Sequence, residues 1–372
     1  MKKSLLVLAG AFAGLLGSCS SNEEVKSRFD FIESFIIAGI EGEIKDNLNL
    51  VYIWTEASNY EALIDSLINK REDIKVSPGA SYSTSESSWT EGLYIENKYT
   101  VTAENGNSRN YSVQIDTVIP KKYSFEIWSY NNGYYIPSGP NSRWTSGNAG
   151  ISIALGILGI DNKNPENYPT KKTAKGYNGS NGVLMETIRG GRVAIKDVPL
   201  FSGNFILGNF NRGKAMEDEL AATEIGKIYF GKPKSIKGYY KYKEGPGDFE
   251  RNGVPEPGTI DSCSMNVRFY QSDSPSSGRD TILTVRDMDT SSLVIASASK
   301  IDCSETKDDE GDSDGFHPFE LLLEYTGEHL KDNHRYKLGM TFAASKYGDS
   351  YSGKIGSTLI VDEIEIIDYD EE

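Results

Sequence analysis

Hydrophobic residues alternate with polar or acidic residues along the last long segment of the chain, from Gly356 to Ile366. Alternation with a period of two, combined with many β-branched residues, predicts a β-strand. Under strict alternation, Asp362 shares a face with the isoleucines of this segment, which makes that face the candidate core face. Those isoleucines are Ile360, Ile364 and Ile366. A buried carboxylate is costly unless it is paired, hydrogen-bonded or bound to a metal, so Asp362 is a candidate site residue.

The clearest turn in the pattern is the Asn105-Gly106 pair, which lies between two alternating segments. Residues 99–103 and 111–115 flank the pair, and this arrangement predicts an antiparallel β-hairpin. The apolar positions match across the turn, with Tyr99, Val101 and Ala103 on one strand and Tyr111, Val113 and Ile115 on the other.

Short alternating segments bounded by Gly, Pro, Ser and Asn recur through the rest of the chain, and few segments have helical periodicity. This pattern favours an all-β protein built from β-sandwiches. Residues 28–117 form one predicted unit, residues 118–122 a linker, and residues 123–372 a second unit that we expect to be a jelly roll. Predicted strands of the second unit are 123–128, 151–155, 183–188, 193–197, 204–209, 226–230, 236–242, 263–270, 281–286, 293–299, 319–325, 335–342 and 357–367.

The first residues carry an export pattern: two lysines precede an apolar run that is too short to span a bilayer. The sequence Leu-Gly-Ser-Cys that ends at Cys19 resembles a bacterial lipobox, which implies a signal peptide over residues 1–18 and a lipid on Cys19. Residues 19–27 are polar and acidic and resemble the surface-export signal of lipoproteins from the Bacteroides group. We therefore predict an outer membrane lipoprotein exposed at the cell surface. An ordinary secretory signal and a periplasmic tether are the alternatives.

The net charge narrows the range of binding partners, and the cysteine count limits the possible disulfide bonds. The net charge is −15 and the basic residues do not cluster, so nucleic acid is not an expected partner. Of the three cysteines, Cys19 is assigned to the lipid. In an oxidising compartment, Cys263 and Cys303 form either a disulfide bond or two buried thiols.

Two family resemblances follow from particular segments. The segment "YTVTAENGNSRNYSVQI" resembles the closing hairpin of bacterial immunoglobulin-like domains, which implies an immunoglobulin-like spacer over residues 28–117. Residues 123–372 resemble the putative carbohydrate metabolism domain (PCMD) of Bacteroides lipoproteins, which implies a jelly roll related to carbohydrate-binding modules. The segments that carry this second resemblance are "YSFEIW", "GKIYFGKPKSIKGYYKYKEG", "FHPFELLLEY" and "LGMTFAASKYGDSYSGKIGSTLIVDEIEI".

The jelly-roll resemblance also implies a metal site. First and last strands of a jelly roll commonly lie side by side, which would bring Glu126 close to Asp362. Two such carboxylates repel each other unless a proton or cation lies between them. Carbohydrate-binding modules often carry a structural calcium there, so we expect Glu126 and Asp362 to be two of its oxygen ligands. An ion pair or a hydrogen-bonded carboxylate is the alternative.

Two aromatic groups are candidates for stacking on sugar rings. The first lies in a segment rich in Gly and Asn, and the second lies in "KGYYKYK". Their members are Tyr130, Tyr134, Tyr135 and Trp144 in the first group, and Tyr239 and Tyr240 in the second. Aromatic residues also fill β-sheet cores, and one of two neighbouring tyrosines in a strand is expected to face the core.

The sequence thus predicts a lipoprotein that binds a polysaccharide or oligosaccharide through its jelly roll, as an accessory to glycan use. A glycoside hydrolase is one alternative and would need two acidic residues at a defined separation. A structural or adhesive surface protein, with a protein partner that the sequence does not identify, is another. No catalytic residue is predicted, because the chain carries no nucleophile elbow, zinc-protease motif or phosphate-binding loop.

Overall fold

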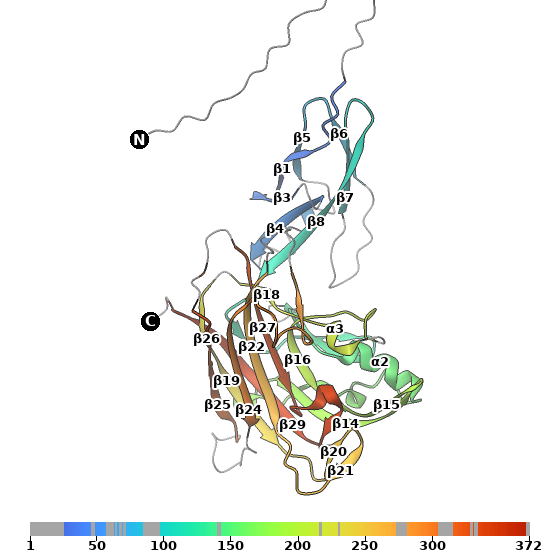
Figure 1. Ribbon diagram of the computed structural model, residues 1–372, viewed down its shortest axis with the longest axis vertical. Coiled ribbons are helices and arrows are strands. Elements are labelled where there is room, and N and C mark those ends of the chain that lie inside the picture. Colours follow the sequence, from blue (N-terminus) through green and yellow to red (C-terminus); the bar gives the residue numbers. More distant parts are fainter. Residues whose placement is uncertain are drawn as a thin grey trace, which may run out of the picture.

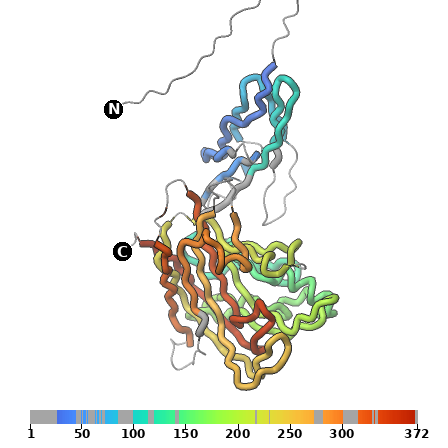
Figure 2. The backbone as a smooth tube through the Cα atoms, in the orientation of Figure 1, coloured from blue at the N-terminus to red at the C-terminus, as the bar shows by residue number. Residues whose placement is uncertain are grey.

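The computed structural model shows two all-β units that lie one beyond the other along the long axis (Figures 1 and 2). Among the described residues, no helix has the length and apolar character needed to cross a membrane. Cys19 lies outside the described residues. Those residues are 26–45, 49–56, 63, 65, 66, 69, 72–84, 97–139, 143–215, 218–229, 231–272, 281–303, 315–327, 330 and 334–369.

The smaller, N-terminal unit contains two sheets with a shared core. One sheet has the order β2-β1-β5 and the other the order β3-β4-β8-β7-β6, in which β4 and β8 run parallel. The predicted hairpin is confirmed, because β7 pairs with β8 and Tyr99 lies opposite Tyr111, both buried against Phe35. The bounds are β1 Ile32–Ile37, β2 Ile40–Glu41, β3 Glu43–Lys45, β4 Leu50–Glu56, β5 Asp73–Val76, β6 Ser81–Thr84, β7 Asn97–Thr102 and β8 Ser108–Val118.

The larger unit is a sandwich of a nine-stranded and a seven-stranded sheet (Figure 1). The nine-stranded sheet has the order β23-β17-β16-β27-β22-β24-β26, with β12 on β16 and β18 on β27. Its strands are β12 Trp144–Thr145, β16 Asn204–Phe210, β17 Thr223–Ile225, β18 Lys227–Ile228, β22 Cys263–Gln271, β23 Leu283–Thr284, β24 Val294–Cys303, β26 Glu324–Tyr325 and β27 Tyr336–Ala343.

The seven-stranded sheet has the order β13-β14-β29-β19-β25, with β15 on β14 and β9 on β29. Its strands are β9 Lys122–Tyr123, β13 Thr170–Thr173, β14 Gly182–Val193, β15 Lys196–Ser202, β19 Pro233–Lys243, β25 His317–Leu322 and β29 Thr358–Asp368. The remaining elements are β10 Trp128–Asn131, β11 Tyr134–Pro137, α2 Asn148–Ile157, η4 Pro165–Asn167, η5 Tyr177–Gly179, α3 Glu219–Ala222, β20 Phe249–Arg251, β21 Val254–Glu256, η6 Gly348–Ser350 and β28 Ser352–Gly353.

A single large core lies between these two sheets. The nine-stranded sheet contributes Phe205 and Met265, and the seven-stranded sheet contributes Val361. Trp144 is 2% exposed and stacks on Phe205 with ring centroids 4.7 Å apart. The all-β prediction is confirmed, and burial of so much apolar surface between the sheets stabilises the sandwich.

Three predicted strands are wrong. Residues 193–197 span the turn between β14 and β15, and residues 124–127 of the predicted strand 123–128 lie between β9 and β10. The third forms a helix. Residues 151–155 belong to helix α2, although their apolar side chains alternate. In the helix, Ile151 and Leu155 lie one turn apart and pack on the same cluster, while Ala154 packs on another. Short apolar segments do not distinguish the two periodicities, so packing decides the structure.

A β-bulge in β29 corrects the predicted face of Asp362. Lys237 and Tyr239 of β19 pair with Glu365 and Asp362 of β29. Gly238, the one residue between Lys237 and Tyr239, therefore lies opposite two residues of β29. Glu363, inside the bulge, has a left-handed φ of 49°. The bulge therefore shifts the alternation of β29 by one residue.

The core-facing residues of β29 change accordingly. Leu359 and Val361 face the core before the bulge, whereas Ile364 and Ile366 face it after the bulge. Asp362 lies on the other face, away from the core and opposite Tyr239, so its predicted place among the core isoleucines is wrong.

The ladder between β22 and β24 contains the two remaining cysteines. Cys263 is disulfide-bonded, and Cys303 is its direct partner in the strand register. The side chain of Cys303 lies outside the described part of the chain. The thiols were expected to be either bonded or free, and for Cys263 the structure has the bonded form.

Candidate functional site

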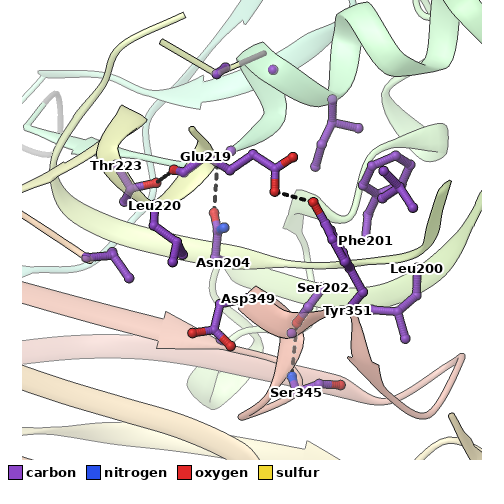
Figure 3. Close-up of a pocket in the computed structure, with 18 of the residues that line it drawn as sticks. Leu200, Phe201, Ser202, Asn204, Glu219, Leu220, Thr223, Ser345, Asp349 and Tyr351 are labelled. Atoms are coloured by element: carbon purple, nitrogen blue, oxygen red, sulfur yellow. Dashed lines mark hydrogen bonds between the residues drawn. The ribbon is translucent and has the colours of Figure 1, made fainter. Parts of the chain in front are cut away.

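A cavity of about 450 Å³ lies on the face of the nine-stranded sheet that points away from the core. We call it the groove. Strands β16, β27 and β22 form its floor, and α2, β15, α3 and the segment around η6 form its walls (Figure 3). Strict alternation in the floor strands sends Phe205, Met265 and Phe342 into the core and leaves their neighbours facing the groove.

The floor of the groove is polar. Asn204, Asn266 and Thr341 contribute amide and hydroxyl groups from three adjacent strands. Asn266 lies opposite Thr341, and its Nδ2 donates to Thr341 Oγ1 at 3.4 Å. This row of groups can donate and accept hydrogen bonds along a direction that crosses the strands.

The walls of the groove are mostly apolar. Phe201 projects from β15 and Leu220 from α3, and both are drawn beside the cavity in Figure 3. Further apolar lining residues are Ile151, Val198, Leu200, Phe210 and Met288. An apolar wall opposite a polar floor is the usual composition of a small-molecule site.

Glu219, Lys196 and Tyr351 form a linked group in the wall. Tyr351 Oη donates to Glu219 Oε2 (Figure 3). Lys196 Nζ lies 2.8 Å from Glu219 Oε1 and 5.0 Å from the centre of the Tyr351 ring. Burial and the hydrogen bond to Glu219 raise the pKa of Tyr351 to about 12. Burial alone would lower the pKa of Lys196, but the hydrogen bonds to Glu219 and Tyr351 raise it. The three groups hold one another in place.

Local structure explains how Glu219 and Tyr351 meet. Asp218 caps the short helix α3 by accepting from the Ala221 backbone N–H at 3.0 Å, which orients Glu219 in the first turn. Tyr351 follows η6 with a left-handed φ of 52°. At Gly348 a Cβ would lie 2.2 Å from Ser202 Cβ, so only glycine allows η6 to approach β15 this closely.

A second carboxylate lines the same groove. Asp349 belongs to η6, whereas Glu219 belongs to α3, so the two acidic groups come from separate walls (Figure 3). A carboxylate can accept hydrogen bonds from sugar hydroxyls, and a pair of carboxylates can also supply the acid and base of glycoside cleavage.

The sequence predicts that Glu126 and Asp362 lie close together, and in the structure both carboxylates accept hydrogen bonds from one turn, residues 176–182. Strands β9 and β29 are paired, as expected for the first and last strands. Asn181 Nδ2 donates to Glu126 Oε2 at 2.9 Å, and Ser180 Oγ donates to Asp362 Oδ2 at 2.6 Å. Both carboxylates thus anchor this turn.

Asp362 is fully buried and accepts three hydrogen bonds. Besides Ser180, the backbone N–H groups of Tyr177 and Glu363 donate to it at 2.9 and 2.8 Å. Burial raises the pKa of Asp362 to about 6, and these hydrogen bonds partly oppose that rise. Within the described ranges, no three His, Cys, Asp or Glu residues are grouped as metal ligands. Calcium at Glu126 and Asp362 stays one prediction, and the hydrogen-bonded carboxylate, which the three donors at Asp362 favour, is the other.

A second cavity, of about 460 Å³, lies beside this turn on the outer face of the seven-stranded sheet. Tyr177 and Tyr239 line it, and their rings stack with centroids 3.6 Å apart and an interplanar angle of 10°. We call these two residues the tyrosine pair. Tyr239 is half-buried whereas its neighbour Tyr240 is in the core, as expected for adjacent tyrosines in a strand.

The predicted aromatic contacts separate into buried and exposed residues. Trp144, Tyr134 and Tyr240 are buried, so they present no ring face to a sugar. Tyr130 is 54% exposed and donates through its hydroxyl to the Lys163 carbonyl. Tyr135 lies under the Lys172 ammonium, 4.3 Å from the ring centre. Of the six candidates, Tyr239 alone lines one of the two cavities described above.

Sequence reasoning missed the groove. Its floor, its walls and its carboxylates come from segments distant in the chain, and Glu219 and Asp349 carry no local motif. The alternation of β16, β22 and β27 could have indicated a polar outer face, because Asn266 and Thr341 interrupt apolar strands and Asn204 begins one.

Comparison with known proteins identifies a family and two similar solved structures. Residues 114–367 match the family described as "Putative carbohydrate metabolism domain". No curated protein matches. A solved structure described as a putative glycoside hydrolase from Bacteroides thetaiotaomicron is 26% identical with a TM-score of 0.61, covering 94% of this chain and 100% of that chain. Another, described likewise from Bacteroides vulgatus, is 28% identical with a TM-score of 0.56, covering 68% of this chain and 99% of that chain.

Proposed function

The chain belongs to the putative carbohydrate metabolism domain family, and we propose that it binds a polysaccharide or oligosaccharide in the groove. The observation that carries this proposal is the pairing of apolar walls with a polar floor in one cavity of about 450 Å³. Sugar rings have flat C–H faces that pack on apolar and aromatic side chains, and hydroxyls that need amide, hydroxyl or carboxylate partners.

The groove supplies both kinds of contact. Phe201 offers an aromatic surface, while Asn204 and Asn266 offer amides on the floor. Glu219 is already oriented by Tyr351, so it can accept a sugar hydroxyl without the cost of ordering a free side chain.

Charge in the groove favours a neutral glycan. Glu219, Asp349 and Asp289 line it, and the lining cations are Lys196 and Lys346. Lys196 is paired with Glu219, and the whole chain has a net charge of −15. A uronic acid would be repelled by this surface, so we expect neutral sugars to bind more tightly.

Glycan-array binding of soluble residues 22–372, followed by calorimetry with the best ligand, tests the proposal. We expect Asn266→Ala to weaken binding about tenfold, since one floor hydrogen bond to the ligand is lost. Asn107→Ala, on the exposed hairpin of the N-terminal unit, is the matched control and should bind as the wild type does. Equal binding by all three proteins would rule out the groove as the site.

A glycoside hydrolase is the second candidate, and the presence of Glu219 and Asp349 in one groove favours it. Both solved relatives are described as putative glycoside hydrolases. Incubation with the bound glycan separates the two functions. New reducing ends that disappear in Glu219→Gln and Asp349→Asn, with binding retained, would establish hydrolysis, whereas an intact glycan would establish a binding protein.

The anchor and the N-terminal unit are proposals from the sequence. We place the protein at the outer membrane through a lipid on Cys19, with an immunoglobulin-like spacer in front of the sugar-binding unit. Cys19→Ala should move the protein from the membrane fraction to the soluble fraction. Cleavage by protease added to intact cells would support surface exposure, and full protection would support a periplasmic location.

A further inference from the structure

We propose that the tyrosine pair, Tyr177 and Tyr239, forms a second sugar-binding site, held in position by Asp362. This inference rests on the proposed function, because it assumes that the ligand is a neutral glycan. The groove occupies the outer face of the nine-stranded sheet, whereas the tyrosine pair occupies the outer face of the seven-stranded sheet. The two sites would therefore hold different parts of one polysaccharide, or two chains.

The pair is built from two distant parts of the chain. Tyr239 lies in β19 directly opposite Asp362 in β29, and Tyr177 begins the turn η5. Their rings are nearly parallel, and Phe316 packs against Tyr177 at an interplanar angle of 78°, with ring centroids 6.0 Å apart. Both tyrosines remain partly exposed and line a cavity of about 460 Å³.

The turn that carries Tyr177 is rigidly anchored. Asp362 accepts from the Tyr177 backbone N–H and from Ser180 Oγ, and Glu126 accepts from the next residue, Asn181. Within the turn, Asn178 has a left-handed φ of 52°. Burying an acidic group and holding a strained residue both cost stability. The presentation of a preorganised aromatic surface to a ligand would account for this cost in stability.

The remaining lining residues suit sugar hydroxyls. Glu363 and Glu365 present carboxylates, and Lys122 contacts Glu365 Oε1 at 2.6 Å. Asn178 adds an amide at the rim. These groups can accept and donate hydrogen bonds around a ring stacked on tyrosine, and their net negative charge disfavours acidic sugars.

Two sites on opposite faces predict avidity. A polymer gains affinity without any new contact when it reaches both sites of one molecule or binds several protein molecules at once. An oligosaccharide that fills one site gains nothing in this way. The test uses native electrophoresis through gels that contain the polysaccharide selected on the glycan array. Retardation is compared for the wild type, Tyr239→Ala, Asn266→Ala and the double variant. Tyr82→Ala, at an exposed tyrosine in β6 of the N-terminal unit, is the matched control.

We expect Tyr239→Ala to lower the affinity for the polymer three- to tenfold, while the affinity of the groove for a short oligosaccharide, measured by calorimetry, is unchanged. Asn266→Ala should retain weak retardation, and the double variant should lose it. Asp362→Asn should resemble Tyr239→Ala, and circular dichroism would confirm that each variant is folded.

The outcomes separate the two proposals. If Tyr239→Ala is retarded as strongly as Tyr82→Ala, and the double variant as strongly as Asn266→Ala, the second site is wrong and the groove is unaffected. If only Tyr239→Ala reduces retardation, the groove is wrong and the tyrosine pair is the sugar site. If the wild type is not retarded by any polysaccharide on the array, both proposals are overturned.

Discussion

Tyr239 and Asp362 face each other directly across the ladder between β19 and β29, on the outer face of the seven-stranded sheet. The β-bulge at Glu363 makes this pairing, because it moves Asp362 off the face that its position in the sequence indicates. The carboxylate then meets the turn that carries Tyr177 rather than the apolar core. An acidic residue in the last strand thus organises a surface site.

The first prediction concerns the pH dependence of stability. The pKa of Asp362 in the folded protein is about 6, above its ordinary value of 3.8, so the folded state binds this proton more tightly than the unfolded state. The resulting stabilisation is complete below about pH 4 and is lost as the pH rises through 6. A shift of this size corresponds to about 3 kcal/mol.

Asp362→Asn lacks this titration, so the free energy of unfolding of the wild type minus that of the variant should fall by about 3 kcal/mol between pH 3 and pH 7. Urea denaturation at several pH values measures it. Asp261, whose pKa is also raised by burial, is present in both proteins and cancels in the difference. A difference that does not change with pH would contradict the assignment.

The second prediction concerns the space beside Asp362. At Gly176 a Cβ would lie 2.6 Å from Asp362 Oδ2 and 2.7 Å from the Asn181 carbonyl oxygen. Gly176→Ala should therefore displace the turn and lower the free energy of unfolding by about 1–3 kcal/mol. Gly247→Ala is the matched control, because a Cβ there meets nothing within 4 Å. Equal melting temperatures for the two variants would show that the turn yields without cost.

The third prediction concerns calcium. Three donors already occupy the oxygens of Asp362, so we expect neither EDTA nor added calcium to change the melting temperature. Differential scanning fluorimetry measures this. A rise of several degrees with calcium that disappears in Glu126→Gln would instead assign a metal to the Glu126 and Asp362 region.

The fourth prediction concerns Cys263. Because Cys263 is disulfide-bonded and lies opposite Cys303 in the ladder, unfolded but unreduced residues 22–372 should contain no free thiol. Cys263→Ser should lower the free energy of unfolding by about 2–5 kcal/mol, since the crosslink restricts the unfolded chain. Labelling of two thiols in the unreduced protein would refute the bond.

The local pattern of hydrophobic and polar residues was sufficient to predict the elements that neighbouring residues determine. The Asn105-Gly106 turn determines its own hairpin, because few residue pairs adopt such a turn and the apolar residues of both strands face one core. The same reasoning identified the all-β class and the strand from Thr358 to Asp368. For the neighbours Tyr239 and Tyr240, alternation correctly required one to face the core without showing which.

Tertiary structure decided the rest. A bulge depends on the pairing of two strands, so the face of Asp362 could not be read from β29 alone. Burial of Trp144 depends on Phe205 and Phe342, which are distant in the chain. The groove exists only where α2, α3 and β15 cover one sheet, because long-range packing brings Glu219, Asp349 and Asn266 into a single cavity that no short segment encodes.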